Sequence, residues 1–215
     1  MHYFILALSK NHARLFEVTA EHITPLEVDG MPNSMANQWA GMEREEGRAG
    51  DVTEEEEDAY LHHVAKSIHT IVHDSKLPLI FAGVAEEYGM IKKFDQSGML
   101  LDAYIKGSAE HMPMEELKEK ADPIVKEHMM KEGEKHLEEY GNLLGTGRTS
   151  ADVDVILIAA EKGKVELLFI TDGTDGQDSR VQEAMAFTSA HRGRIVMVRK
   201  EMIPEGAVIA AILRL

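Results

Sequence analysis

Cysteine is absent from the 215-residue sequence. Its absence excludes disulfide bonds, thiol catalysis and thiolate metal sites, and it fits a reducing compartment. The sequence also lacks an apolar run of the length, about 18 residues, that a membrane-spanning helix requires. Its first residues lead straight into an apolar stretch, without the basic segment and the small-residue cleavage site of a secretory signal. We therefore expect a globular, cytoplasmic protein that has no membrane partner.

Positive charge is scarce in this acidic chain, whose net charge is −15. Residues 1–150 hold 15 basic and 28 acidic side chains, and residues 151–215 hold 8 and 10. Phosphate contacts require clustered Lys and Arg, so the first part is a poor surface for nucleic acid and we expect no DNA partner. In the second part a small basic set is the best candidate for RNA contact, although solvation of the surface explains it equally well. The set comprises Arg192, Arg194, Arg199 and Lys200.

Several motifs of catalysis and cofactor binding are missing. No glycine loop has the spacing that cradles phosphates in nucleotide-binding folds. The apolar stretches Phe4 to Leu8 and Leu77 to Ala82 carry no carboxylate, whereas a two-metal nuclease needs clustered carboxylates on its central strands. His69 and His73 lie four residues apart, but His62 is too distant on a straight helix to complete a metal site with them. We therefore expect no metal and no cofactor, and the sequence favours a protein that is not an enzyme without deciding the point.

The first 150 residues predict strands followed by alternating helices and strands. Apolar runs predict strands at Tyr3 to Leu8, Ala13 to Val18, Ile23 to Val28 and Leu77 to Ala82. Helical spacing predicts helices from Asp58, over Val84 to Phe94, and over Met114 to Leu144. The last is predicted in two pieces, because Pro123 can open a helix but disrupts a helix interior. The acidic run Glu54 to Asp58 is interpreted as a solvated helix start that suits the helix dipole.

The last 65 residues predict a compact α/β unit. Ser150 is a candidate N-cap, and a helix is predicted from there to a stop at Gly163. A buried strand at Val165 to Ile170, a helix at Arg180 to Ala190, and two more strands follow. Such alternation argues for helices covering a largely parallel sheet. We place the domain boundary at the glycine-rich segment Gly145 to Ser150, giving domains 1–146 and 147–215.

The order and spacing of several stretches resemble a known family over nearly the whole chain. Residues 159–172 resemble the helix-Gly-strand entry to the C-terminal domain of archaeal and eukaryotic peptide release factors and of Pelota. The stretches Gly193 to Val196 and Gly206 to Arg214 are similar to the closing strands of Pelota. The N-terminal stretches that resemble the bacterial and archaeal release-factor-like proteins called baeRF are Phe4 to Ser9, Arg14 to Phe16 and Gly30 to Ser34.

The resemblance implies a fold and a function. It implies an α/β protein with an RNase H-like N-terminal domain of the release-factor middle type, followed by a C-terminal domain of the Pelota and release-factor type. Release factors use a Gly-Gly-Gln tripeptide to cleave the peptidyl-tRNA ester, and this tripeptide is absent here. The resemblance therefore implies a non-hydrolytic, translation-associated factor that binds ribosomes or tRNA in rescue, quality control or dormancy. The alternative is a protein-interaction module that has kept the fold without RNA binding.

The stretch Met31 to Glu57 is the long loop that would carry the tripeptide. It shows no apolar period over nearly 30 residues, which is long for a connection in a compact domain, and we expect it to be the most mobile part of the chain. Gln38 and Trp39 are its candidates for contact with a partner, because a loop tryptophan can stack on a base or anchor a protein. A solvated Gln38 and a Trp39 that folds back over the loop are the alternatives.

Overall fold

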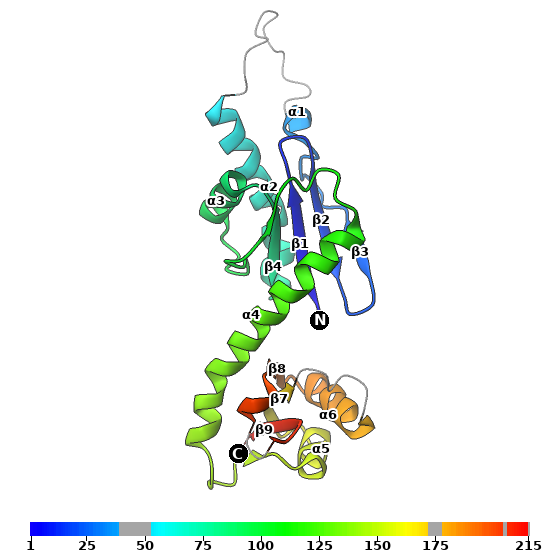
Figure 1. Cartoon of the computed structure of the whole chain (residues 1–215), viewed down its shortest axis with the longest axis vertical. Helices are drawn as coiled ribbons and strands as arrows, with labels where there is room; N and C mark the ends of the chain where they lie inside the picture. The colour runs from blue at the N-terminus through cyan, green and yellow to red at the C-terminus, as the bar shows by residue number, and fades with distance from the viewer. Residues whose placement is uncertain (39–52, 172–177, 204–205, 215) are drawn as a thin grey trace, which may run out of the picture. The chain divides into compact units, whose positions relative to one another are not determined.

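The computed structural model describes residues 1–38, 53–171, 178–203 and 206–214 (Figure 1). These residues form two compact units, Met1–Lys126 (unit 1) and Glu127–Leu215 (unit 2). The division falls inside one helix, α4 (Met114–Asn142), whose first part belongs to unit 1 and whose second part belongs to unit 2. The boundary predicted at Gly145 to Ser150 therefore lies after the helix that the two units share. Within the described ranges, no helix is long and apolar enough to cross a membrane.

Unit 1 is built on a five-stranded sheet with the order β3-β2-β1-β4-β5. The strands are β1 (Tyr3–Leu8), β2 (Ala13–Val18), β3 (Ile23–Leu26), β4 (Leu79–Gly83) and β5 (Ile105–Lys106). Strands β1, β2 and β3 form an antiparallel meander, and β1, β4 and β5 run parallel. The strands predicted from apolar runs are present, and β3 is an edge strand that contains Pro25, where proline costs no hydrogen bond inside the sheet.

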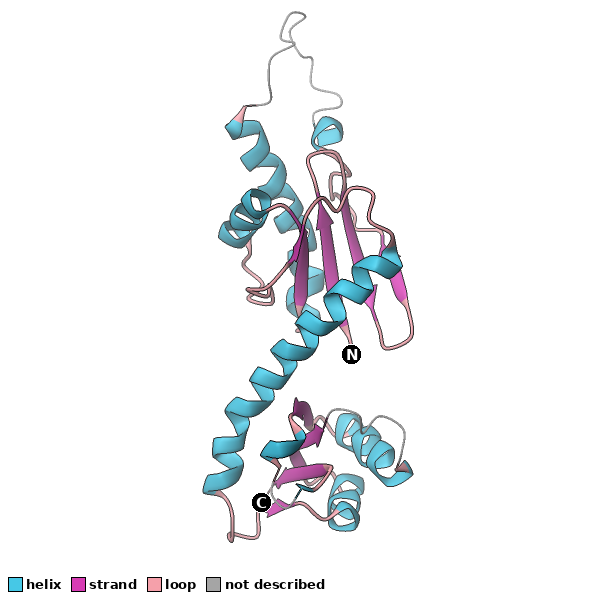
Figure 2. Ribbon diagram, viewed as in Figure 1, coloured by secondary structure: helices cyan, strands magenta, loops and turns pink. Residues whose placement is uncertain are grey.

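Helices cover both faces of this sheet (Figure 2). One face packs on α2 (Glu54–Ser75) and α3 (Ala85–Phe94), whose buried side chains include Tyr60, Val64 and Ile91. The opposite face meets the first part of α4, where the hydroxyl of Tyr3 donates a hydrogen bond of 2.6 Å to Asp122. Every residue of β1 is buried, which agrees with its continuous apolar sequence.

The acidic run does start a helix, as the sequence predicts. Thr53 caps α2, since its hydroxyl accepts the N–H of Glu56 and the carboxylate of Glu56 accepts the N–H of Thr53. Glu54 to Glu57 fill the first turn, where negative charge suits the positive end of the helix dipole.

The prediction that Pro123 would divide its helix is wrong, because α4 is continuous from Met114 to Asn142. Proline removes the hydrogen bond to the carbonyl of Glu119, and both residues lie on the exposed side of the helix. The opposite side buries Leu117, Ala121 and Val125 completely. Burial of these three side chains on either side of the proline holds one helix together despite the lost bond.

Unit 2 contains a four-stranded sheet with the order β6-β9-β7-β8. The strands are β6 (Thr149–Ser150), β7 (Val165–Thr171), β8 (Arg194–Val198) and β9 (Ile209–Leu213). Only β7 and β8 pair parallel, whereas β9 pairs antiparallel with both β6 and β7. The expectation of a largely parallel sheet is therefore wrong. The alternation of helix and strand ends after β8, and the last strand returns between β6 and β7.

Each face of the unit 2 sheet carries a separate apolar core. Helices α5 (Val153–Glu161) and α6 (Ser179–Ala190) pack on one face through residues such as Ile156 and Val181. On the other face Tyr140 of α4 packs edge-on against Phe169 of β7. Asp152, and not Ser150, caps α5, since its carboxylate accepts the N–H groups of Asp154 and Val155.

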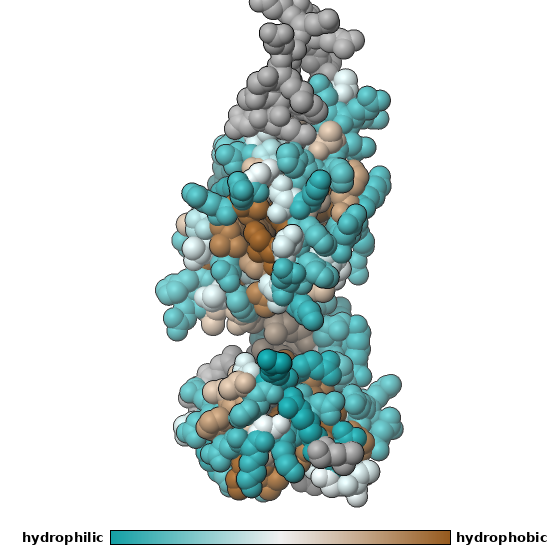
Figure 3. Space-filling view, turned by 180° about the vertical axis from the view of Figure 1, so that it is seen from behind, coloured by the Kyte–Doolittle hydropathy of each residue, from teal (hydrophilic) through white to brown (hydrophobic). Residues whose placement is uncertain are grey.

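Teal, hydrophilic surface covers much of the face of each unit seen in Figure 3.

Candidate nucleic-acid interface

Arg192 and Arg194 flank a tight turn between α6 and β8. Arg192 has a φ of 60°, in the left-handed region, and the N–H of Gly193 bonds the carbonyl of Thr188. A Cβ at Gly193 would lie 2.8 Å from the carbonyl oxygen of Val165, so only glycine lets the turn approach β7 this closely. The turn presents both arginines at the surface, where both are exposed.

Arg199 and Lys200 lie at the other end of β8. The five residues of this strand separate them from Arg194 by about 16 Å at roughly 3.3 Å per residue. The guanidinium of Arg199 is also engaged, at 3.2 Å from the carboxylate of Glu127 and at 3.0 Å from that of Glu134. The structure therefore does not bring the four predicted RNA-contact residues together, and Arg199 is committed to α4.

The turn that carries Arg192 belongs to an edge of the sheet where other cations gather. Strands β6, β7 and β8 start at this edge, and β9, which runs the opposite way, ends there. The segments that meet at it are 147–149, 161–166, 189–195 and 213–214, which we call the basic edge. They contain six Lys and Arg side chains against two Glu, a net charge of +4 in a chain of net charge −15. The six are Arg148, Lys162, Lys164, Arg192, Arg194 and Arg214.

Hydrogen bonds tie the four segments of the basic edge together. Nη1 of Arg214 donates to the carbonyl of Gly163 at 2.9 Å and to that of His191 at 3.3 Å, which joins the turn after α5 to the turn after α6. Nε of Arg148 donates to the carbonyl of Leu213 at 3.2 Å. Arg214 also donates its backbone N–H to the carbonyl of Lys164. These bonds fix the four backbone segments, and the side chains of Arg148 and Arg214, relative to one another.

Sequence reasoning identified two of these six cations and missed four. Arg148, Lys162, Lys164 and Arg214 are scattered over 67 positions, and no local pattern links them. The available signal for Lys162, Lys164 and Arg214 was their position close to the end of an apolar strand, whereas Arg148 precedes the short polar strand β6. It became informative only once the direction and order of the strands were known.

The second group of predicted contact residues consists of Gln38 and Trp39, and the short helix that contains Gln38 follows the carboxyl end of β1 in space. Gln38 is the last residue of the short helix α1 (Met35–Gln38), which the N–H of Met35 joins to the carbonyl of Lys10. Trp39 lies outside the described residues, as does most of the stretch predicted to be mobile. The placement of Gln38 and Trp39 as a contact pair therefore stays a prediction.

A charged cluster borders the same end of the sheet. Lys10 and Glu57 form an ion pair of 2.8 Å, and the hydrogen bond to Glu57 raises the pKa of Lys10. Glu87 is 5 % exposed, and burial raises the pKa of its carboxyl, a direction that the nearby Glu57 and Glu86 reinforce. The N–H of Val84 and the ammonium of Lys10 act in the opposite direction. Within the described ranges, no three His, Asp or Glu side chains are grouped closely enough to hold a metal ion.

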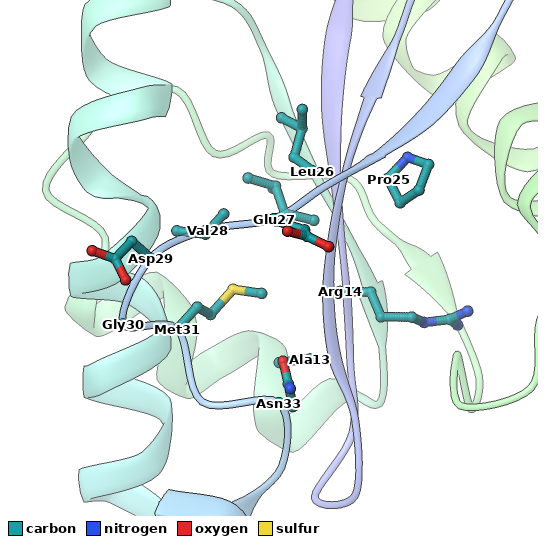
Figure 4. Close-up of a pocket in the computed structure, with 11 residues that line it drawn as sticks. Ala13, Arg14, Pro25, Leu26, Glu27, Val28, Asp29, Gly30, Met31 and Asn33 are labelled. Atoms are coloured by element: carbon teal, nitrogen blue, oxygen red, sulfur yellow. The ribbon is translucent and has the colours of Figure 1, made fainter.

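A separate hollow of about 610 Å³ lies beside the edge strand β3 (Figure 4). Its lining combines apolar side chains, among them Met31 and Leu26, with Glu27 and Asp29. The guanidinium of Arg14 points away from it to the carbonyl of Ala109, at 2.6 Å. None of the predicted contact residues lines this hollow.

Comparison with known proteins gives the chain a family and a fold. The family model described as bacterial archaeo-eukaryotic release factor family 3 matches residues 2–164. An archaeal Pelota, from a model of the ribosome-bound protein with ABCE1, is similar with a TM-score of 0.64 and 18 % identity, over 99 % of this chain and 61 % of that one. No curated protein sequence matches.

Two further solved structures are similar at lower scores. S. cerevisiae Dom34 has a TM-score of 0.45 and 15 % identity over 99 % of this chain and 62 % of its own. The archaeal termination factor aRF1 has a TM-score of 0.40 and 16 % identity over 100 % of this chain and 62 % of its own. The chain thus spans about three fifths of the length of each of these proteins. The likeness to archaeal Pelota shows the fold, a mixed α/β arrangement with two sheets.

Proposed function

Because the chain belongs to bacterial archaeo-eukaryotic release factor family 3, we propose that it is a translation-associated factor that binds ribosomes without cleaving peptidyl-tRNA. Its context would be rescue, quality control or dormancy, and its compartment the cytoplasm, where ribosomes act. The observation that carries the proposal is a release-factor-like chain without the Gly-Gly-Gln tripeptide. Such a chain keeps a surface for the ribosome but lacks the group that positions water at the ester.

The fold of unit 1 supports the finer part of the proposal, an RNase H-like middle-type domain. An antiparallel meander β1-β2-β3 continues into parallel β4 and β5, with helices on both faces. A nuclease activity for such a domain lacks support, since the described strands β1 and β4 carry no carboxylate. The domain would act as a scaffold.

Charge supports contact with the ribosome through unit 2. Residues 1–150 have a net charge of −13 and repel phosphate, whereas Arg192 and Arg194 stand exposed in residues 151–215, whose 8 basic and 10 acidic side chains give a net charge of only −2. The archaeal Pelota of similar fold is bound to a ribosome together with ABCE1. By analogy, this chain would occupy a ribosomal site, with tRNA or a second protein as a further partner.

Co-sedimentation with ribosomes over a series of salt concentrations tests the proposal. We expect the full chain to sediment with ribosomes at low salt, and the double variant Arg192→Ala with Arg194→Ala to bind more weakly with a smaller salt dependence. Replacing Glu54 and Glu55 by Gln, at exposed positions of the first turn of α2, should leave binding unchanged or slightly stronger. A chain that never sediments with ribosomes at any salt would contradict the proposal.

The acidity of the first 150 residues favours one second candidate function, a protein-interaction module that has kept the fold and lost RNA. Its net charge of −13 is the specific observation. In that case the chain would not sediment with ribosomes at any salt concentration.

A further inference from the structure

We propose that the basic edge of unit 2 is a binding site for the sugar–phosphate backbone of RNA, formed by Lys162, Lys164, Arg192 and Arg194 and held in place by Arg148 and Arg214. This inference rests on the proposed ribosome binding and names the ligand chemistry and the residues. It also replaces Arg199 and Lys200, which lie at the opposite end of β8, with Lys162 and Lys164, which the sequence did not group with Arg192 and Arg194.

The first argument is the geometry of the edge. Neighbouring strands of a sheet lie about 4.8 Å apart, so the three steps from β6 through β9 and β7 to β8 cover roughly 14 Å. Lys164 precedes β7, and Arg194 begins β8, the strand beside it. Cations spaced along such a row can meet successive phosphates of one strand, which a single isolated cation cannot do.

The second argument is that the cations fall into two groups, one bound within the edge and one without an ion pair. Arg214 and Arg148 donate hydrogen bonds to carbonyl oxygens of the edge itself, and Arg148 also lies 3.3 Å from the carboxylate of Glu166. Within the described ranges, no ion pair joins Lys162, Lys164, Arg192 or Arg194 to a carboxylate. These four side chains keep their charge available to an outside anion, and all four are exposed.

Compensation of helix dipoles explains part of this pattern but not all of it. Helices α5 and α6 both end at this edge, and a cation near a helix C-terminus is stabilising. Arg214 already serves both ends, because it donates to the carbonyls of Gly163 and His191. Arg194 is the first residue of β8 and makes no hydrogen bond with the end of either helix among the described residues. Compensation of the helix dipoles therefore does not account for its charge.

The surface chemistry favours a polyanion over a protein as the occupant. Stable protein interfaces depend on a few buried aromatic or aliphatic anchors. The large apolar side chains that are exposed in the described ranges include Leu144, Val155, Ile158, Met202 and Val208, and none belongs to the four segments of the basic edge. Charge without an apolar anchor is the signature of sequence-independent binding to phosphates.

The test compares two triple variants of the full chain, each of which removes three positive charges from unit 2. The edge variant carries Lys164→Gln, Arg192→Gln and Arg194→Gln. The control variant carries Lys131→Gln, Lys135→Gln and Lys200→Gln, at positions outside the basic edge. Arg148 and Arg214 stay in place in both variants, so the hydrogen bonds between segments are kept, and thermal unfolding verifies that both fold.

Binding of a 20-base-pair RNA duplex of arbitrary sequence is measured by fluorescence anisotropy between 50 and 200 mM KCl. Each lost phosphate contact lowers the slope of log K against log [KCl] by about 1, so we expect the edge variant to lose about 2 to 3 from the slope and at least about 10-fold in affinity at low salt. The control variant should keep the wild-type slope. Equal losses in both variants, or no loss in either, would overturn the assignment.

Two further measurements separate this inference from the proposed function. If the wild-type chain sediments with ribosomes and the edge variant does so with an unchanged salt slope, ribosome binding stands and the RNA site at the basic edge is refuted. If the edge variant loses binding to a poly-glutamate peptide while it keeps binding to the RNA duplex, the edge is a surface for an acidic protein and the RNA assignment is likewise refuted. A wild-type chain that binds the duplex but never ribosomes retains the site and refutes the proposed function.

Discussion

Gly133 of α4 lies directly against the carbonyl group of Met197 in β8, with no space for a side chain between them. A Cβ at position 133 would stand 3.0 Å from the carbonyl carbon of Met197 and 2.8 Å from Cγ1 of Val198. Glycine in a helix interior normally costs about 0.5 to 1 kcal/mol relative to alanine. The close packing of α4 on the unit 2 sheet explains why glycine stands here.

Gly133→Ala is therefore expected to destabilise unit 2 by about 1 to 3 kcal/mol, because the methyl group meets backbone atoms that cannot yield easily. Gly141→Ala on the same helix is the matched control. A Cβ there meets nothing within 4 Å, so the variant should gain about 0.5 to 1 kcal/mol from helix propensity. Urea unfolding of the two variants measures both effects, and a Gly133→Ala variant as stable as Gly141→Ala would disprove the contact.

The buried carboxyl of Glu87 should make the stability of unit 1 depend on pH. Burial raises the pKa of its carboxyl above the ordinary value of 4.5, so the folded state binds the proton more tightly than the unfolded state. Its ionisation therefore destabilises the fold as pH rises through the folded pKa, and protonation removes that penalty as pH falls toward 4.5.

The variant Glu87→Gln should accordingly be more stable than the wild type at pH 7, and its advantage should shrink as pH is lowered from 7 to 4. Thermal unfolding at half-unit pH steps measures the difference. Glu86→Gln, at the exposed preceding position, controls for the loss of one acidic side chain. An advantage of Glu87→Gln that is constant over this range would show that burial of the charge is not its cause.

Arg199 is expected to contribute to packing and not to RNA binding. Its guanidinium bridges Glu127 and Glu134 of α4, at 3.2 and 3.0 Å. Arg199→Gln should leave the salt slope for ribosomes and for the RNA duplex unchanged, while it lowers the unfolding free energy by at most about 1 kcal/mol, as is usual for partly exposed pairs. Arg194→Gln should lower the salt slope and leave the unfolding free energy unchanged. A reduced slope in Arg199→Gln would return that residue to the set of RNA contacts.

Absence of the Gly-Gly-Gln tripeptide predicts no release activity. The purified chain should hydrolyse neither peptidyl-tRNA on ribosomes nor free RNA above background, as measured by release of a labelled peptide and by gel analysis of the RNA. Gln38→Ala is the informative variant, because Gln38 is the candidate glutamine of the loop stretch. Release that persists through purification and disappears in Gln38→Ala would show that the chain is a hydrolase.

Much of the fold followed from the sequence alone. Apolar runs placed β1, β2 and β7, the acidic run placed the start of α2, and the order of these stretches pointed to the release-factor-like family that the family model confirms. The strands and the helix start are local features, because a buried strand and a capped helix start are each encoded within a few neighbouring residues. The order of the stretches along the chain can likewise be seen in the sequence.

Tertiary structure alone decided what depends on distant packing. Pro123 sits inside a continuous helix because buried neighbours on the far side of α4 outweigh one lost hydrogen bond. Strand β9 inserts antiparallel between β6 and β7, which no local alternation encodes. That insertion carries Arg214 to Gly163 and His191 and gathers cations from Arg148 to Arg214 at one edge. Charge density at a surface is set by the order and direction of strands, and the linear sequence specifies these only through the packing of the whole unit.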